Sequence, residues 1–249
     1  MFDERTFVGK RIMVTGASSG IGRSTAILLS QLGANIVLIG RDGTRLQSTL
    51  DKMATGDHTV LSFDLQNFDE YDAMLAQCIA KGKLDGLVHC AGIAKVIPIK
   101  AVSVNNIHET MDTNFTSFLM LMKYLSKKRF TNDGASFVVL SAINAHYPQK
   151  CMSVYVASKA ALEAAVKTLA LELYERKMRI NTLVVGPVAT PMGGFPLDSE
   201  EGKGVHSDIT PNLMGLALPQ QIAEMAAYLL SDACSYTTGR NFYVDGGRL

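Results

Sequence analysis

Residues 11–22 read Arg-Ile-Met-Val-Thr-Gly-Ala-Ser-Ser-Gly-Ile-Gly and decide the fold of this chain. The apolar run 11–15 predicts a buried strand, which leads straight into a glycine-rich turn at 16–22 and a helical stretch at 21–32. Glycine in such a turn adopts positive φ and lets backbone N–H groups approach a pyrophosphate, while the helix directs its positive end at the same anion. Tight strand–helix turns also use glycine for steric reasons alone. The position of this turn at the first strand–helix junction is what favours a dinucleotide site.

Short apolar runs alternate with longer amphipathic stretches along the rest of the chain. The expected strands are 11–15, 35–39, 59–63, 84–90, 136–141, 180–185 and 242–244. The expected helices are 21–32, 43–54, 68–81, 106–129, 153–176 and 219–231. Continuously apolar strands indicate a sheet covered by helices on both faces, and the β-then-α alternation indicates parallel strands. We therefore expect one α/β domain over residues 1–249, a doubly wound (Rossmann) parallel sheet of about seven strands.

The composition excludes several classes of protein. Lysine and arginine (24) nearly balance aspartate and glutamate (23), so nothing predicts a nucleic-acid or membrane-surface partner. The four cysteines form no CxxC pair and no secretion signal precedes them, so we expect neither a metal site nor disulfides. No apolar run approaches membrane-spanning length, and a cytoplasmic location is the expectation.

One segment interrupts the alternation of strands and helices. Residues 189–218 are rich in proline and glycine and show little apolar periodicity. A loop of this length in a compact α/β domain is usually functional, so we expect a substrate-binding lid, although a plain surface insertion is the alternative. Its apolar residues suggest a partly apolar ligand; they are Met192, Phe195, Leu197, Leu213, Met214 and Leu216.

The glycine spacing and several later segments resemble the short-chain dehydrogenase/reductase family. Thr15 followed by G-x-x-x-G-x-G resembles its fingerprint, and His89-Cys90-Ala91-Gly92 stands where the family has Asn-Asn-Ala-Gly. Residues 188–192 and 243–247 are similar to its nicotinamide-contacting and carboxy-terminal segments, although Val185 replaces a common proline before Gly186. The resemblance implies a nicotinamide dinucleotide, with cofactor-binding candidates Gly16, Ser18, Ser19, Gly20, Ile21, Gly22, Arg41, Asp64, Leu65, Ala91, Gly92, Tyr155, Lys159, Val188 and Thr190.

The end of the second expected strand bears on the choice of dinucleotide. An acid there would accept hydrogen bonds from a ribose 2′-hydroxyl and repel a 2′-phosphate. Gly40 takes that place, and Arg41 offers a planar, permanent charge to a phosphate. Asp42 could neutralise Arg41, and an ordinary solvated turn is the alternative. We expect NADP, with NAD as the less favoured cofactor.

Tyr155 and Lys159 are the candidates for proton transfer. Four residues apart at the start of an alanine-rich helix, they share one face. A nearby ammonium stabilises a phenolate, so Lys159 is expected to lower the pKa of Tyr155 toward the working pH. The spacing alone proves little, because Tyr124 and Lys128 repeat it without a preceding strand. The family's arrangement of strand, loop and tyrosine is what favours catalysis at Tyr155.

Two further catalytic candidates follow from the resemblance. In many relatives a serine precedes the tyrosine by thirteen residues, a count that falls here on Ala142, while Ser141 precedes by fourteen. If the loop absorbs one residue, Ser141 faces the nicotinamide and orients the substrate carbonyl; if the strand continues regularly, Ser141 turns away. The first arrangement is our expectation. Asn114 matches the family's helix asparagine and is expected to fix a water or a helix distortion that links Lys159 to solvent.

These observations predict an oxidoreductase that transfers a hydride between NADP(H) and a carbonyl/alcohol substrate. Two alternatives stay open: a nucleotide-binding regulator with little turnover, and a sugar-nucleotide epimerase or dehydratase, for which 249 residues leave little room. The helices 106–129 and 155–173 carry apolar residues on more than one face, so a homodimer or homotetramer is expected.

Overall fold

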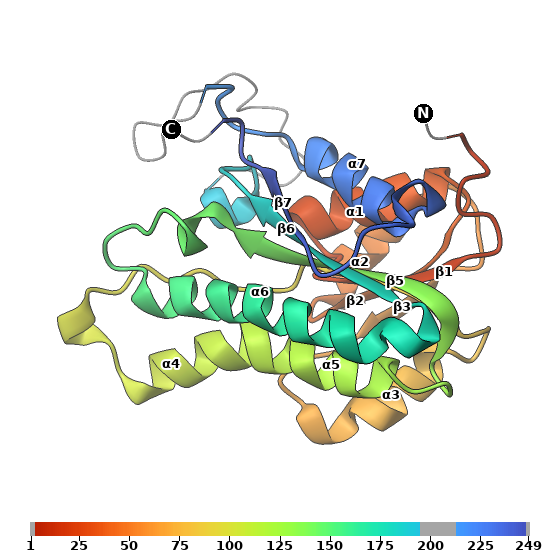
Figure 1. The fold of residues 1–249 in the computed structure, drawn as a ribbon, viewed down its shortest axis with the longest axis horizontal. Coiled ribbons are helices and arrows are strands. Elements are labelled where there is room, and N and C mark those ends of the chain that lie inside the picture. The colour runs from red at the N-terminus through yellow and green to blue at the C-terminus, as the bar shows by residue number, and fades with distance from the viewer. Residues whose placement is uncertain (1–2, 195–212, 248–249) are drawn as a thin grey trace.

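The computed structural model describes residues 3–194 and 213–247, and its strands form one sheet in the order β3-β2-β1-β4-β5-β6-β7 (Figure 1). Every neighbouring pair runs parallel. The strands are β1 (Arg11–Thr15), β2 (Asn35–Gly40), β3 (Thr59–Ser62), β4 (Leu84–His89), β5 (Thr131–Ala142), β6 (Arg179–Val185) and β7 (Asn241–Val244). The predicted doubly wound α/β fold is confirmed.

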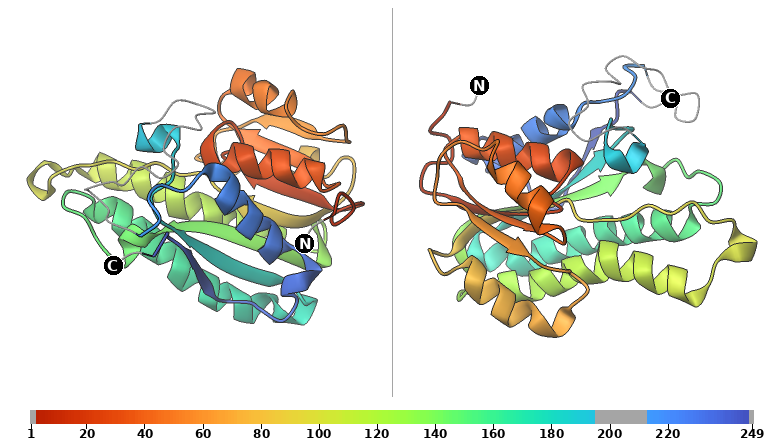
Figure 2. Two further views of the ribbon diagram at one scale, coloured as in Figure 1. Left: turned by 90° about the horizontal axis from the view of Figure 1, so that it is seen from above. Right: turned by 180° about the vertical axis from the view of Figure 1, so that it is seen from behind.

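Helices cover both faces of this sheet. They are α1 (Gly20–Gln31), α2 (Gly43–Leu50), α3 (Tyr71–Cys78), α4 (Val104–Met111), α5 (Ser117–Leu125), α6 (Ser153–Leu173) and α7 (Pro219–Leu230). Helices α1, α2 and α7 lie on one face, with α1 and α7 side by side, and α3, α5 and α6 lie on the other (Figures 1 and 2).

The two layers of helices explain why the strands are apolar without a break. In β2, the side chains of Ile36 and Leu38 belong to the core beneath α1 and α7, and those of Val37 and Ile39 to the core on the α5 and α6 side. All four are fully buried. Because successive side chains of a strand point to opposite faces, only a strand covered twice buries each of them.

Two elements differ from their expected bounds in ways that affect the site. The expected helix 106–129 is divided into α4 and α5 by a π-helical turn, Asp112–Thr116, and such turns often occur at functional sites. Strand β5 continues regularly through Ala142, one residue beyond its expected end. This extra residue fixes the direction of the Ser141 side chain.

The described part of the chain contains no helix long and apolar enough to cross a membrane. Within the same residues, no three His, Cys, Asp or Glu side chains are grouped so that they could hold a metal ion. Most of the expected lid, including Phe195 and Leu197, lies outside the described residues. Its two ends are described, and the N–H of Ala189 donates to the carbonyl oxygen of Ala217 at 2.9 Å, beside a parallel bridge between Val188 and Ala217.

Candidate active site

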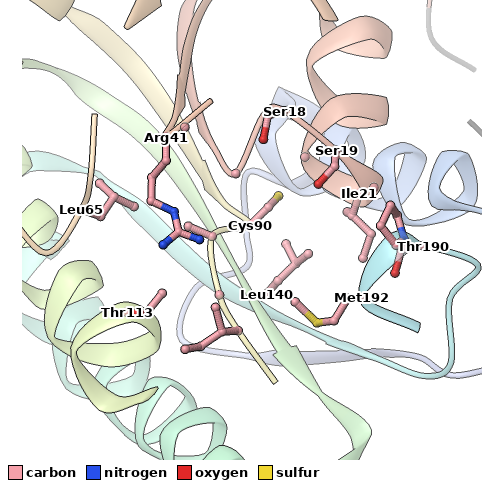
Figure 3. Close-up of a pocket in the computed structure, with 18 of the residues that line it drawn as sticks. Ser18, Ser19, Ile21, Arg41, Leu65, Cys90, Thr113, Leu140, Thr190 and Met192 are labelled. Carbon is pink, nitrogen blue, oxygen red and sulfur yellow. The ribbon is translucent and has the colours of Figure 1, made fainter. Parts of the chain in front are cut away.

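A cleft opens at the carboxyl ends of β1 and β4, which are neighbours in the sheet although β2 and β3 separate them in sequence (Figure 3). Ligands of doubly wound sheets bind at this kind of topological switch point. The expected cofactor residues that line the cleft are Gly16, Ser18, Ser19, Gly20, Ile21, Gly22, Arg41, Asp64, Leu65, Ala91, Gly92 and Thr190. Three expected cofactor residues, Tyr155, Lys159 and Val188, do not line it. The lining also contains residues outside the expected cofactor set: Gly40, Arg45, Phe63, Cys90, Ile93, Thr113, Leu140, Pro191 and Met192.

The glycine-rich turn has the geometry of a phosphate-binding loop. Gly16 and Gly20 have φ of 66° and 53°, which side-chain-bearing residues rarely adopt. A Cβ at Gly22 would lie 2.3 Å from the carbonyl oxygen of Gly16, so any side chain there would push the turn apart. Helix α1 begins at Gly20, and Ser18 and Ser19 lie beside it in the cleft (Figure 3). These residues fit a pyrophosphate at a helix N-terminus.

Two arginines line the cleft beyond the end of β2. Arg41 extends into the cleft and Arg45 follows from the first turn of α2 (Figure 3 for Arg41). The carboxylate of Asp42 is occupied elsewhere, because its Oδ1 accepts the backbone N–H of Arg45 at 3.0 Å and caps α2. The structure shows no ion pair between Arg41 and Asp42. The sequence signal that could have identified Arg45 is its position four residues, or about one helical turn, after Arg41.

Tyr155 and Lys159 lie one turn apart in α6, and both are more than nine-tenths buried. The Nζ atom of Lys159 donates to the carbonyl oxygen of Leu140 at 2.9 Å and lies 6.0 Å from the centre of the Tyr155 ring. Burial lowers the pKa of Lys159 to about 8 and raises the pKa of Tyr155 to about 12. The expected lowering of the tyrosine pKa is therefore wrong, because burial disfavours the charged phenolate.

Asn114 is fully buried within the π-helical turn Asp112–Thr116. Its Oδ1 accepts the N–H of Ile93 at 2.8 Å, and its Nδ2 donates to the carbonyl of Ile93 and to the Ser158 hydroxyl. A methyl group on Gly92 would lie 3.2 Å from Asn114 Oδ1 and 3.4 Å from Lys159 Nζ. The helix distortion thus brings Asn114 close to Lys159, beside the cleft.

The side chain of Ser141 points away from the cleft, contrary to the expected arrangement. Its hydroxyl donates to Oε1 of Glu163 at 2.6 Å and lies 3.3 Å from the carbonyl oxygen of Lys159. Because β5 is regular to its end, Ser141 and Ala142 point to opposite faces. Leu140, two residues before Ala142, lines the cleft, so the Ala142 side is the cleft side. The one-residue loop adjustment that would have turned Ser141 toward Tyr155 is absent.

His89 and Cys90 are the two departures from the family's Asn-Asn pair; Cys90 lines the cleft and His89 does not. The ring of His89 is buried, and its Nδ1 is 3.0 Å from the hydroxyl of Thr15, which also accepts the N–H of Ala91 at 3.2 Å. Burial lowers the pKa of His89 to about 3 and raises the pKa of Cys90 to about 12, so both side chains are neutral. This pairing connects β1 to β4 below the cleft without adding charge.

Comparison with known proteins agrees with this geometry. The family described as Enoyl-(Acyl carrier protein) reductase matches residues 16–248. Glucose 1-dehydrogenase of Gluconobacter oxydans is 32% identical over 97% of this chain and 92% of its own. D-erythrulose reductase of Gallus gallus is 29% identical over 100% and 99%. A glucose/ribitol dehydrogenase structure from Brucella melitensis, 27% identical and covering 98% of each chain, superposes with a TM-score of 0.88.

The fold and the cleft define a Rossmann-type oxidoreductase that takes a nicotinamide cofactor, NAD or NADP. The chain belongs to the short-chain dehydrogenase/reductase family.

Proposed function

We propose that this protein is an NADP(H)-dependent reductase or dehydrogenase of a carbonyl/alcohol pair, with Tyr155 as its general acid and base. One observation carries the proposal: Lys159, one helical turn after Tyr155 in α6, donates to the carbonyl oxygen of Leu140, which lines the cleft at the switch point of the sheet. Lys159 Nζ and Asn114 Oδ1 both approach Gly92, which lines that cleft. A dinucleotide in the cleft and a proton-transfer group at its end make up an oxidoreductase site.

NADP(H), when bound, would supply or accept the hydride. In the reductive direction the phenol of Tyr155 gives its proton to the substrate oxygen, and a pKa of about 12 keeps that proton in place at neutral pH. Lys159, whose pKa is about 8, carries a positive charge at neutral pH and stabilises the phenolate that remains. Asn114 holds the chain at Ile93 and holds Ser158 of α6, so its role is to position Lys159.

The preference for NADP rests on the residues after β2. Gly40 brings no negative charge, Arg41 and Arg45 line the same end of the cleft, and the Asp42 carboxylate is turned to the helix N-terminus. Within residues 3–194 and 213–247 neither guanidinium group forms an ion pair, and both can bind a 2′-phosphate through paired N–H donors.

A second candidate, a nucleotide-binding regulator with little turnover, is favoured by the end of β5. The side chain that faces the cleft there is Ala142, and the Ser141 hydroxyl is occupied by Glu163. The end of β5, which the structure describes, then offers no hydroxyl in the cleft that would hold a substrate carbonyl. Binding of NADPH without turnover would support this candidate.

The two candidates are separated by following NADPH consumption with a panel of carbonyl compounds. Two relatives are named for glucose and for D-erythrulose, so polyhydroxylated aldehydes and ketones come first, followed by apolar ketones because Met192 lines the cleft. Turnover that disappears in Tyr155→Phe, while NADPH still binds, supports the enzyme. Turnover that survives in Tyr155→Phe would contradict the assigned role of Tyr155.

We also propose that residues 189–218 form the substrate lid and that the chain assembles as a dimer or tetramer. The described ends of the lid segment bring Thr190 and Met192 to the cleft. Leu171 and Tyr174, at and just beyond the end of α6, are 79% and 76% exposed, and such apolar surface on a long helix is typical of a subunit interface.

A further inference from the structure

Glu163 is a buried carboxylate that the proposed chemistry does not use. It lies on α6 one turn after Lys159, and its side chain is only 8% exposed. Among the described residues, no lysine or arginine forms an ion pair with it. Three other side chains donate hydrogen bonds to it: Ser141 Oγ at 2.6 Å, Asn241 Nδ2 at 2.6 Å and His146 Nε2 at 2.8 Å.

These donors come from three separate segments of the chain. Ser141 is at the end of β5, His146 follows the short turn Ile143–Ala145, and Asn241 begins β7. The Tyr243 ring lies 5.2 Å from that of His146, centre to centre, with its hydroxyl 3.2 Å from His146 Nε2. Through one carboxylate, α6 is therefore joined to β5, to β7 and to the loop 143–152.

The loop 143–152 connects the cleft side of β5 to the helix that carries Tyr155. Its far end is joined to the segment after β4, because the carbonyl oxygen of Cys151 accepts the N–H of Ile97 at 2.6 Å. Cys151 has φ of 66°, an unfavourable value for a non-glycine residue that persists only where surrounding contacts impose it. Glu163 fixes one end of the loop and this backbone bond fixes the other.

Packing alone does not account for a carboxylate at this position. A buried carboxylate is unfavourable unless its oxygens are hydrogen-bonded, and an apolar side chain of the same size would fill the space without that requirement. The three donors give Glu163 a directional hold on each segment, which an apolar contact would not give.

We propose that Glu163 is a positioning residue, whose carboxylate holds the loop 143–152 in place and thereby sets the substrate side of the site relative to Tyr155. The proposal rests on the proposed oxidoreductase function. It assigns Glu163 to substrate binding and not to cofactor binding, because the loop that Glu163 holds through His146 leads to Tyr155, and no residue of this loop lines the dinucleotide cleft.

Glu163→Gln is the direct test, since it keeps the size of the side chain but turns one acceptor oxygen into a donor that faces other donors. We expect the substrate KM to rise at least tenfold, kcat to change less than threefold, and NADPH affinity, followed by cofactor fluorescence, to stay unchanged. Glu172→Gln, an exposed glutamate on the same helix, is the matched control and should leave all three unaltered. His146→Leu should reproduce the rise in KM, whereas His146→Gln, which keeps a donor, should reverse most of it.

A second measurement does not depend on turnover. Hydrogen exchange of the 143–152 amides in the cofactor-free protein should be faster in Glu163→Gln than in the wild type. If Glu163→Gln does not fold, His146→Leu, whose side chain is about a third exposed, takes its place in both measurements. A folded variant with unchanged KM and unchanged exchange overturns the proposal. Absence of wild-type turnover would instead overturn the proposed function, while the exchange rates still decide whether Glu163 holds the loop.

Discussion

Moving the serine hydroxyl from position 141 to position 142 tests whether Ala142, and not Ser141, faces the cleft at the end of β5. Ala142→Ser places a serine thirteen residues before Tyr155, on the side of β5 whose neighbour Leu140 lines the cleft. A hydroxyl there can donate to a substrate carbonyl and stabilise the charge that develops on its oxygen. Removing one such donor from an enzyme lowers turnover by about 10²–10³-fold, and we expect a newly added one to raise kcat about tenfold or more.

Ser141→Ala is the companion change, and it should act on stability and not on the chemical step. The hydroxyl of Ser141 is buried and donates to a carboxylate at 2.6 Å. A hydrogen bond to a charged group contributes about 1.5–3 kcal/mol to the free energy of unfolding. For a chain of this size that corresponds to a fall in Tm of about 3–12 °C. His146 and Asn241 still hold Glu163, so kcat and KM should change by less than about threefold.

Steady-state kinetics with NADPH and the best carbonyl substrate, together with thermal unfolding of each variant, check both expectations. The cofactor affinity of Ala142→Ser must equal that of the wild type for the comparison to report on the substrate oxygen. A hundredfold loss of turnover in Ser141→Ala with unchanged Tm would refute this reasoning, because it would show that the Ser141 hydroxyl reaches the reacting atoms after all. No gain in Ala142→Ser would show that position 142 does not face the substrate.

Three further predictions concern the cofactor, pH and assembly. Arg41→Asp should weaken NADPH binding by about 10–100-fold or more and leave NADH binding little changed, with Arg45→Ala acting in the same direction; an unchanged ratio of the two dissociation constants would exclude a role in binding the 2′-phosphate. The rate of carbonyl reduction should fall as pH rises through about 8, because the Lys159 ammonium is present below its pKa and lost above it, and a rate that stays level from pH 7 to 9.5 would contradict this. Because the pKa of Lys159 is about 8 in the folded chain and 10.5 in the unfolded chain, its buried charge destabilises the folded state fully below pH 8 and not at all above pH 10.5. Lys159→Met removes this charge, so it should raise Tm at pH 7, and the rise measured in thermal scans should shrink between pH 8 and 10.5. Light scattering at micromolar concentration should give the mass of a dimer or tetramer, and a strictly monomeric mass would show that Leu171 and Tyr174 are not interface residues.

The features that the sequence predicts well are those set by local chemistry. Apolar runs such as 35–39 mark strands covered on both faces, and the glycines at 16, 20 and 22 mark a turn that needs positive φ or a close backbone approach. The residues of this turn line the cleft because the carboxyl ends of parallel strands meet at one edge of the sheet. Each of these properties depends on a few neighbouring residues, so the sequence contains all that is needed.

The features that could not be predicted depend on register and on distant partners. A shift of one residue turns a strand's side chains to the opposite face. The sequence near Ser141 does not show whether the loop after β5 is one residue longer than in relatives, so it does not show which face Ser141 takes. The pKa of Tyr155 is set by how fully α6 is buried, which depends on the packing of the whole layer. Asn241 bonds to Glu163 across 78 residues, a contact that exists only because β7 returns beside β6.

One local signal would nevertheless have identified Glu163. In α6 the polar residues Tyr155, Lys159 and Glu163 recur every four positions on a buried face that otherwise consists of Ser158 and apolar residues, and all three are more than nine-tenths buried. Polar groups on the core face of a helix are unfavourable unless each is hydrogen-bonded, so their presence there indicates a specific structural or functional role. In the proposed function Tyr155 transfers the proton, and Lys159 supplies the charge that stabilises the phenolate. Glu163 holds the loop that positions the substrate. The spacing of four places these three residues on one face of a single helix, so Glu163 fastens the loop 143–152 to the same element that carries Tyr155.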